Sequence, residues 1–290
     1  MAGHNHNHGD QKLSIAVFIN ILLTIAQVIG GLISGSLSLV ADALHNLSDA
    51  GAIIIAIIAR RIGNKPANHT MTYGYKRAEI IAVLINSTTL ILIGLYLIYE
   101  AINKYFNPSP IDGWIIVWIA GIALVIDTTT ALLTYHSGAK DNMNIRAAFI
   151  HNVSDALASV VVIVAGALII LYQWFIVDLI ATIGISIYVI YHGLILLKKS
   201  IMIMMQATPA EVSIPELKKR LSALTGVEKV QHIHVWQLDD KSIFFEGHIY
   251  LTSKSETSFK QEIREILQNE YRINHATLEI HQNKEQGQLA

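Results

Sequence analysis

The chain has 290 residues, of which 52% are hydrophobic and only 15% are charged, and its mean hydropathy is +0.45. Soluble domains carry a charge on about 25% of their residues, so this composition predicts that lipid surrounds much of the chain. The net charge of −1 gives no general attraction to nucleic acid, and the lack of cysteine excludes disulfides, thiolate metal sites and a cysteine nucleophile. Any metal ion must therefore be held by histidine, aspartate and glutamate.

Six apolar segments follow one another, each about as long as the roughly 20 residues that cross a bilayer as a helix. We predict spans at 13–34, 37–59, 78–101, 113–136, 145–172 and 175–197. When six spans are threaded, the basic residues of the loops fall on one side, with Lys104 as the exception. By the positive-inside rule, the sequence predicts a multi-pass integral protein of the inner or plasma membrane with both termini in the cytoplasm.

The composition changes after the sixth predicted span. Apolar periodicity and turn residues predict, in chain order, helix 214–224, strand 227–238, turn 239–242, strand 243–252, helix 259–268 and strand 276–281. This α-β-β-α-β order suits a small α+β domain with its helices on one face of a sheet. The predicted fold is an α-helical membrane protein of six transmembrane helices plus this cytoplasmic domain. We predict four regions: a His-containing cytoplasmic tail at 1–12, the six-helix transmembrane domain at 13–207, the α+β domain at 208–283 and a disordered tail at 284–290.

Two predicted spans carry the same polar motif, His-Asn-(Leu/Val)-Ser-Asp. It runs from His45 to Asp49 in the second span and from His151 to Asp155 in the fifth. The i, i+4 spacing places the histidine and the aspartate on one helical face. A carboxylate at the bilayer centre costs roughly 2.5–3.5 kcal/mol even on insertion scales, so these faces are expected to avoid lipid. If the two faces meet, they supply four nitrogen and oxygen ligands, which suits tetrahedral Zn²⁺.

Other interpretations of the polar residues within the spans stay open. Each His–Asp pair can stabilise packing, although two near-identical copies weaken that explanation, or the pairs can form a proton relay without metal. Four residues inside the motifs orient the ligands or serve as small packing residues: Asn46, Ser48, Asn152 and Ser154. Asp42 and Asp127 are either entry or proton residues, or are hydrogen-bonded within the bundle. Glu79 and Asp178 lie near span ends, where we expect a solvated or salt-bridged role.

Histidines outside the spans offer further candidate metal sites. His4, His6 and His8 alternate with polar residues near the start of the chain, which is typical of a metal-collecting segment or of a solvated tail. His69 follows the second predicted span and is a weaker candidate. In the terminal domain, several histidines lie on or beside predicted strands: His232, His234, His248, His275 and His281. Two or three of them together would form a regulatory metal site, whereas a lone strand histidine is usually an ordinary half-exposed residue.

The paired motifs, the six spans and the terminal α+β domain resemble the cation diffusion facilitator family, and within it the zinc-transporting branch. Segment 72–79 at the entry to the third span and the sequence His-Val-Trp at 234–236 resemble that family too. The resemblance implies a homodimer that exports Zn²⁺ from the cytoplasm in exchange for protons by alternating access. It implies that the transport site consists of His45, Asp49, His151 and Asp155.

The same resemblance implies a metallochaperone-like terminal domain, in which a regulatory zinc ion is bound by His232, His248 and His281. His45 replaces an acid found in some relatives, and this favours zinc over cadmium or iron. Asn283 stands where some members place a bridging aspartate, so a binuclear terminal site is not expected. Only His69 represents the loop site of some members, so that site is expected to be reduced or absent.

Other function classes fit the sequence less well. The chain has no Gly-x-x-x-x-Gly-Lys-(Ser/Thr) loop, so the energy for transport must come from an ion gradient or another subunit. It has no His-Glu-x-x-His, so we expect no intramembrane metalloenzyme and no enzymatic activity. A membrane-bound metal sensor would need only the terminal histidines and leaves the paired motifs unexplained. The expected partners are the lipid bilayer, a second copy of the chain, Zn²⁺ and protons, and no nucleic acid.

Overall fold

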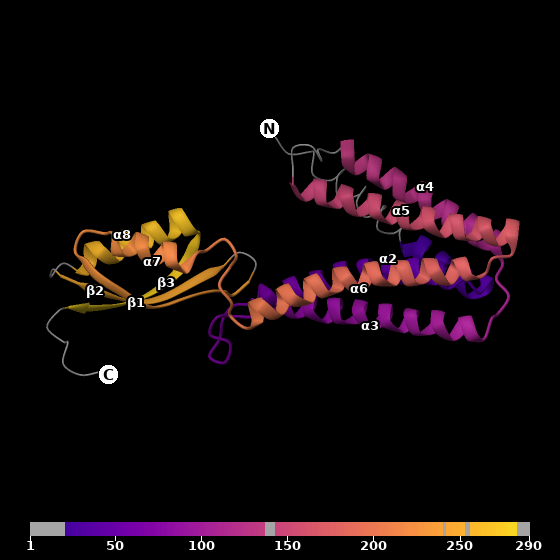
Figure 1. The fold of residues 1–290 in the computed structure, drawn as a ribbon. Helices are drawn as coiled ribbons and strands as arrows, with labels where there is room; N and C mark the ends of the chain where they lie inside the picture. The colour runs from indigo at the N-terminus through magenta and orange to yellow at the C-terminus, as the bar shows by residue number, and fades with distance from the viewer. Residues whose placement is uncertain (1–20, 137–142, 240–241, 253–255, 283–290) are drawn as a thin grey trace, which may run out of the picture. The chain divides into compact units, whose positions relative to one another are not determined.

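The computed structural model describes residues 21–136, 143–239, 242–252 and 256–282. Its first part consists of long apolar helices (Figure 1): Ile21–Ser34, α2 (Leu37–Gly63), α3 (Ala78–Phe106), α4 (Gly113–His136), α5 (Met143–Tyr172) and α6 (Ile176–Met204). Helices α2 to α6 are long and apolar enough to cross a membrane, and Ile21–Ser34 is shorter. Residues 13–20 of the first predicted span lie outside the described part. The predicted class, a multi-pass helical membrane protein, is confirmed.

Apolar side chains lie both inside and outside this helical unit. An inner core draws on all five long helices: Leu39 from α2, Leu97 from α3, Ile116 from α4, Val162 from α5 and Ile185 from α6. Large apolar side chains are also exposed along the same helices, among them Leu92, Trp118 and Leu171. Soluble proteins rarely expose contiguous apolar surface of this kind. The helices therefore present a surface suited to lipid around a packed interior.

The first turn of α2 is bound by a buried carboxylate from α6. Oδ1 of Asp178 accepts hydrogen bonds from the hydroxyls of Ser36 (2.5 Å) and Ser38 (2.6 Å). Its two oxygens also accept the backbone N–H groups of Leu37 (2.9 Å) and Ser38 (3.2 Å). A carboxylate here satisfies helix N–H groups that have no partner within the helix and complements the helix dipole.

The role expected for Asp178 was therefore wrong, because its side chain is fully buried and bonded rather than solvated or salt-bridged. Glu79, in contrast, lies 3.9 Å from Arg60 as an exposed ion pair.

The turn before α2 depends on Gly35, whose φ is +70° and where a Cβ would lie 2.8 Å from the carbonyl oxygen of Pro110. Lys104 also donates a hydrogen bond to the carbonyl of Gly35. The N-terminal end of α2 is thus held to its neighbours by polar contacts.

The C-terminal part forms a small α+β fold in the predicted order (Figure 1). It comprises α7 (Ile214–Ser222), β1 (Val227–Gln237), β2 (Ile243–Leu251), α8 (Glu256–Tyr271) and β3 (Ile273–Gln282). In the sheet, β2 lies in the middle, antiparallel to β1 and parallel to β3. Both helices lie on the same face, where Leu221, Phe245 and Leu267 are among the buried core residues. Helix α8 and strand β3 both extend beyond their predicted bounds.

Internal contacts divide the chain into two compact units. One contains the residues up to Ile57 together with Ile85–Leu197. The other contains Ile58–Leu84 together with the residues from Lys198 onward, and so includes the α+β fold. The predicted boundary at 207/208 falls between the end of α6 and the start of α7.

Replacing Asp178 with alanine is expected to lower the melting temperature of the detergent-solubilised protein. The change leaves two hydroxyls and two backbone N–H groups without their acceptor, and each unsatisfied buried group costs about 1–3 kcal/mol. Asp178→Asn keeps one acceptor oxygen and should melt at an intermediate temperature.

The matched control for this test is Asp112→Ala. Asp112 caps the start of α4 by accepting the N–H groups of Trp114 and Ile115, but in an exposed place. Loss of such a cap costs about 1 kcal/mol. Equal melting temperatures for Asp178→Ala and Asp112→Ala would show that the buried carboxylate does not hold α2.

Candidate metal centres

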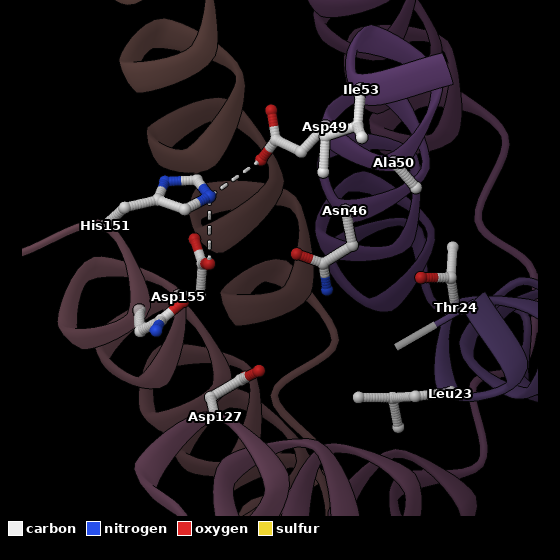
Figure 2. Close-up of a pocket in the computed structure, with 10 residues that line it drawn as sticks. Leu23, Thr24, Asn46, Asp49, Ala50, Ile53, Asp127, His151 and Asp155 are labelled. Atoms are coloured by element: carbon white, nitrogen blue, oxygen red, sulfur yellow. Dashed lines mark ion pairs between the residues drawn. The ribbon is translucent and has the colours of Figure 1, made fainter. Parts of the chain in front are cut away.

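Two imidazoles and two carboxylates from α2 and α5 meet inside the helical unit. Nε2 of His45 lies 3.6 Å from Oδ2 of Asp49 and 3.6 Å from Oδ1 of Asp155. Nε2 of His151 lies 3.3 Å from the same Asp49 oxygen and 3.5 Å from Oδ2 of Asp155. Figure 2 shows both contacts of His151 as dashed lines. We call these four residues the His–Asp quartet; they are the residues that the sequence predicted as transport ligands.

The quartet contains pairs within each helix and pairs between the helices. The i, i+4 spacing sets the pairs within α2 and within α5, as the sequence predicted. Between the helices, His45 pairs with Asp155, and His151 pairs with Asp49. This crossed pairing fits antiparallel helices, as expected of the second and fifth of six successive spans. The histidine of each helix then lies level with the aspartate of the other.

The spacing of the quartet atoms fits a small tetrahedral cation. A zinc ion about 2.0–2.1 Å from each ligand spaces neighbouring ligand atoms about 3.3–3.4 Å apart. His45, Asp49 and Asp155 offer ligand atoms that all lie within 4.8 Å of one another, and Nε2 of His151 lies 3.3 Å and 3.5 Å from oxygens of the two aspartates. Direct hydrogen bonds would be shorter, at about 2.7–3.2 Å. Two of the buried oxygens, Oδ2 of Asp49 and Oδ1 of Asp155, have no hydrogen-bond partner in the described part of the chain. These lone pairs are therefore free to bind a cation.

A pocket of about 160 Å³ adjoins the quartet (Figure 2). It is lined by Leu23, Thr24, Asn46, Asp49, Ala50, Ile53, Asp127, His151, Asn152 and Asp155. The side chain of His151 is 48% exposed, whereas that of His45 is 12% exposed. The quartet is thus accessible from the side of His151 and closed on the side of His45.

The other polar residues of the spans bond away from the quartet. Asn46 donates to Gln27 and Asn152 donates to Thr134. Ser48 donates to Asn86, and Ser154 donates to the carbonyl of Ile150 in its own helix.

Asp42 accepts a hydrogen bond from Gln27, and Asp127 accepts one from Ser159. Both aspartates are therefore hydrogen-bonded within the bundle, which was one of their two expected interpretations.

Two aromatic residues of α6 beside the quartet were not predicted from the sequence. The ring of Tyr188 meets the ring of His45 edge-on, with 6.2 Å between their centres. The ring of His192 lies 4.5 Å from that of Tyr188. A tyrosine and a histidine four residues apart within an apolar span were the available signal, because that spacing places both on one helical face.

A second cluster lies on strands β2 and β3 of the C-terminal fold. Nδ1 of His248 lies 3.1 Å from Nε2 of His281. The carboxylate of Glu279 lies 3.3 Å from Nε2 of His248 and 3.5 Å from Nε2 of His281. The ring of His232 lies 4.9 Å from the ring of His248, at an irregularity of β1 where its φ is +48°. We call His248, Glu279 and His281 the strand cluster.

Glu279 is the member that sequence reasoning missed. It is two residues before His281 on β3, so period two places both on one face of the sheet, and the parallel pairing sets Glu279 opposite His248.

The other predicted histidines lie outside this cluster. The ring of His275 lies 4.7 Å from that of Phe244. His69 is exposed, and the described residues include no metal-binding group around it. His4, His6, His8 and Asn283 lie outside the described residues.

Comparison with known proteins yields matches along almost the whole chain. The family model described as the cation efflux transmembrane domain matches residues 13–205. The cadmium, cobalt and zinc/H(+)-K(+) antiporter of Bacillus subtilis is 35% identical over 284 residues, which cover 96% of this chain and 91% of that protein. The zinc transporter ZitB of Pectobacterium atrosepticum is 34% identical over 282 residues, which cover 96% of this chain and 88% of that protein. The solved metal-bound C-terminal domain of the CzcD transporter from Cupriavidus metallidurans is 21% identical, with a TM-score of 0.23, and covers 24% of this chain and 99% of that domain.

Proposed function

This chain belongs to the cation efflux family, and from that premise we propose that it exports Zn²⁺ from the cytoplasm through the His–Asp quartet in exchange for protons. The family membership confirms the resemblance seen in the paired motifs, and the names of the relatives describe transporters rather than enzymes. Relatives named as zinc transporters support zinc as the substrate.

The observation that carries the proposal is the geometry of the quartet. Two imidazole nitrogens and two carboxylates, paired at 3.3–3.6 Å, match the ligand types preferred by Zn²⁺. A site made of oxygen alone would favour Mg²⁺, Ca²⁺ or Mn²⁺. A proton relay without metal would need direct or water-linked hydrogen bonds, and the long spacings around shared, unbonded oxygens fit a cation better.

The same ligands explain how zinc movement is coupled to protons. Zinc binds neutral imidazole and ionised carboxylate, so zinc binding releases protons from the site. Imidazole titrates near neutral pH, so protons that enter from the outer side compete with zinc and favour its release there. We infer that one or both of His45 and His151 carry the exchanged proton. The relative named as a zinc/H(+)-K(+) antiporter supports this coupling.

Topology and assembly complete the proposal. The excess of basic residues in the loops of one side supports cytoplasmic termini, and the C-terminal fold then lies in the cytoplasm. A homodimer is proposed from the family resemblance. The regions proposed from the sequence, 1–12, 13–207, 208–283 and 284–290, remain the working domain boundaries.

Zinc flux into proteoliposomes that contain a pH indicator tests the quartet. Wild-type protein should move zinc and protons in opposite directions. His45→Ala and Asp155→Ala should each lower the zinc flux by more than about 100-fold, because loss of a direct ligand costs more than the 10–100-fold typical of outer-shell partners. Ser154→Ala is the control, since Ser154 bonds only to the carbonyl of its own helix among the contacts described, and it should retain full flux.

Two outcomes would contradict the proposal in different ways. Zinc flux that survives both quartet substitutions would mean that the ion crosses elsewhere. Zinc flux without any change of pH in wild-type vesicles would leave the quartet as the site but remove proton exchange.

We further propose that the strand cluster, together with His232, binds a regulatory zinc ion. Two imidazoles and a carboxylate lie within 3.1–3.5 Å of one another, and these are common zinc ligands. The ring of Tyr250 stacks on His281 at 4.6 Å and restrains its orientation. His232 is near enough to the ring of His248 to supply a fourth ligand.

Zinc titration of the full chain tests this second site. In a background of Asp49→Ala and Asp155→Ala, which disables the quartet, calorimetry should still detect zinc binding. His281→Ala should lower the remaining affinity by at least about 100-fold, and Glu279→Gln by about 10–100-fold. Binding should weaken as the pH falls, because zinc binds only the deprotonated forms of these ligands. The control His275→Ala, whose ring packs on Phe244, should bind normally; an equal loss in this variant would refute the strand cluster as the site.

A further inference from the structure

A chain of side chains connects the helix Ile21–Ser34 with the pocket beside the quartet. Nε2 of Gln27 donates to Oδ2 of Asp42 over 2.7 Å, and Nδ2 of Asn46 donates to Oε1 of Gln27 over 3.1 Å. Gln27 is fully buried, and Asp42 is only 1% exposed. We call Asp42, Gln27 and Asn46 the amide chain. Its last member lines the pocket, next to Asp49 and Asp155.

The order of donors and acceptors sets which way the amide of Asn46 faces. A carboxylate accepts hydrogen bonds, so Gln27 turns its NH₂ group toward Asp42 and its oxygen toward Asn46. Asn46 must then give its own NH₂ group to Gln27, which leaves its carbonyl oxygen on the pocket side. Figure 2 shows this oxygen pointing into the pocket. The amide chain thus presents an oxygen ligand, rather than a donor, to whatever occupies the pocket.

A carboxylate lies at the far end of the same pocket. Asp127 of α4 lines it and is 7% exposed, and in Figure 2 it lies below the quartet residues His151 and Asp155. Ser159 donates to its Oδ2 over 3.2 Å, and Ser159 is one helical turn beyond the ligand Asp155 on α5. Asp42 is likewise nearly one turn before the ligand His45 on α2. In antiparallel helices these two displacements point toward the same end of the bundle.

The burial of Asp42 is a further sign that this region receives a cation. Its Oδ1 is buried and has no hydrogen-bond partner among the described residues. The donors that the structure records for Asp42 and Asp127, an amide and a hydroxyl, are both neutral. Anionic groups at membrane depth are costly without compensating charge, so a purely structural role would be served better by apolar residues.

We propose that Asn46 Oδ1 and Asp127 form an oxygen-donor station for Zn²⁺ beside the quartet, and that Asp42 and Gln27 are positioning residues that hold the Asn46 amide in orientation. The inference rests on the proposed function and adds a step to it. Oxygen ligands without imidazole hold zinc less tightly than the mixed quartet does. An ion that leaves the quartet toward this end of the bundle therefore exchanges its ligands stepwise, through a weaker site, instead of losing all four at once.

Zinc flux kinetics in proteoliposomes test the station through the amide chain. Asn46→Ala and Gln27→Leu should each lower the maximal rate about tenfold, as loss of a supporting partner does, while the half-saturating zinc concentration stays unchanged because the quartet is intact. The double variant should be no slower than Asn46→Ala, because Gln27 acts only through Asn46. Asp127→Ala should also lower the maximal rate. Ser48→Ala, on the same helix but bonded to Asn86, should transport normally.

A rescue variant separates positioning from a loss of folding. In the Gln27→Leu background, Asn46→Asp should restore the maximal rate, because both oxygens of a carboxylate are acceptors whichever way it turns. Any of three results would overturn the station: single variants that keep the wild-type maximal rate, effects that multiply in the double variant, or failure of the rescue. As long as the wild-type protein transports zinc, the proposed function would still stand. A wild-type protein that moved no zinc would overturn both.

Discussion

Carboxylates at membrane depth must find their partners within the protein, because lipid provides none. The described carboxylates of the helical unit differ in the partners they meet. Asp178 binds the start of α2 through hydroxyls and backbone N–H groups. Asp49 and Asp155 face imidazoles, and Asp42 and Asp127 face neutral donors. The helix Ile21–Ser34, α2, α4 and α5 line the pocket, and their arrangement meets these needs.

The kind of partner also separates an anchoring carboxylate from one that can bind an ion. Asp178 accepts four hydrogen bonds, three of them at Oδ1 and one at Oδ2, so both of its oxygens are engaged by donors. The quartet oxygens instead keep ion-pair distances of 3.3–3.6 Å, so their lone pairs stay available. A single residue type thus fixes the scaffold in one place and can hold a cation in another, and the local supply of N–H and O–H donors makes the difference.

The features that were predictable from the sequence are those set by short-range periodicity. Hydropathy over about 20 residues locates the spans, period two locates the strands, and the i, i+4 motif places each histidine beside its aspartate. The α-β-β-α-β order of the C-terminal fold was predicted for the same reason. The one span for which the structure describes only a shorter helix, Ile21–Ser34, is the first.

Pairings between distant residues were not predictable in this way. Asp178 lies near a span end, and nothing local indicates that it meets Ser36, 142 residues away in the chain. Glu279 joins the strand cluster only because the parallel register of β2 and β3 sets it opposite His248. In the sequence, Gln27 is an isolated polar residue within an apolar segment, and its spacing does not indicate a contact with Asp42. In each case packing, rather than sequence spacing, brings the partners together.

The crossed pairing of the quartet has a consequence for the direction of transport. Exchanging α2 with α5 exchanges His45 with His151 and Asp49 with Asp155, so each helix contributes the same two ligand types. An ion that approaches from either face of the membrane therefore meets one histidine and one aspartate. The ligands alone cannot make movement one-way: the direction must come from the gradients across the membrane and from residues that break the symmetry, such as Asp127 on α4 and Tyr188 on α6.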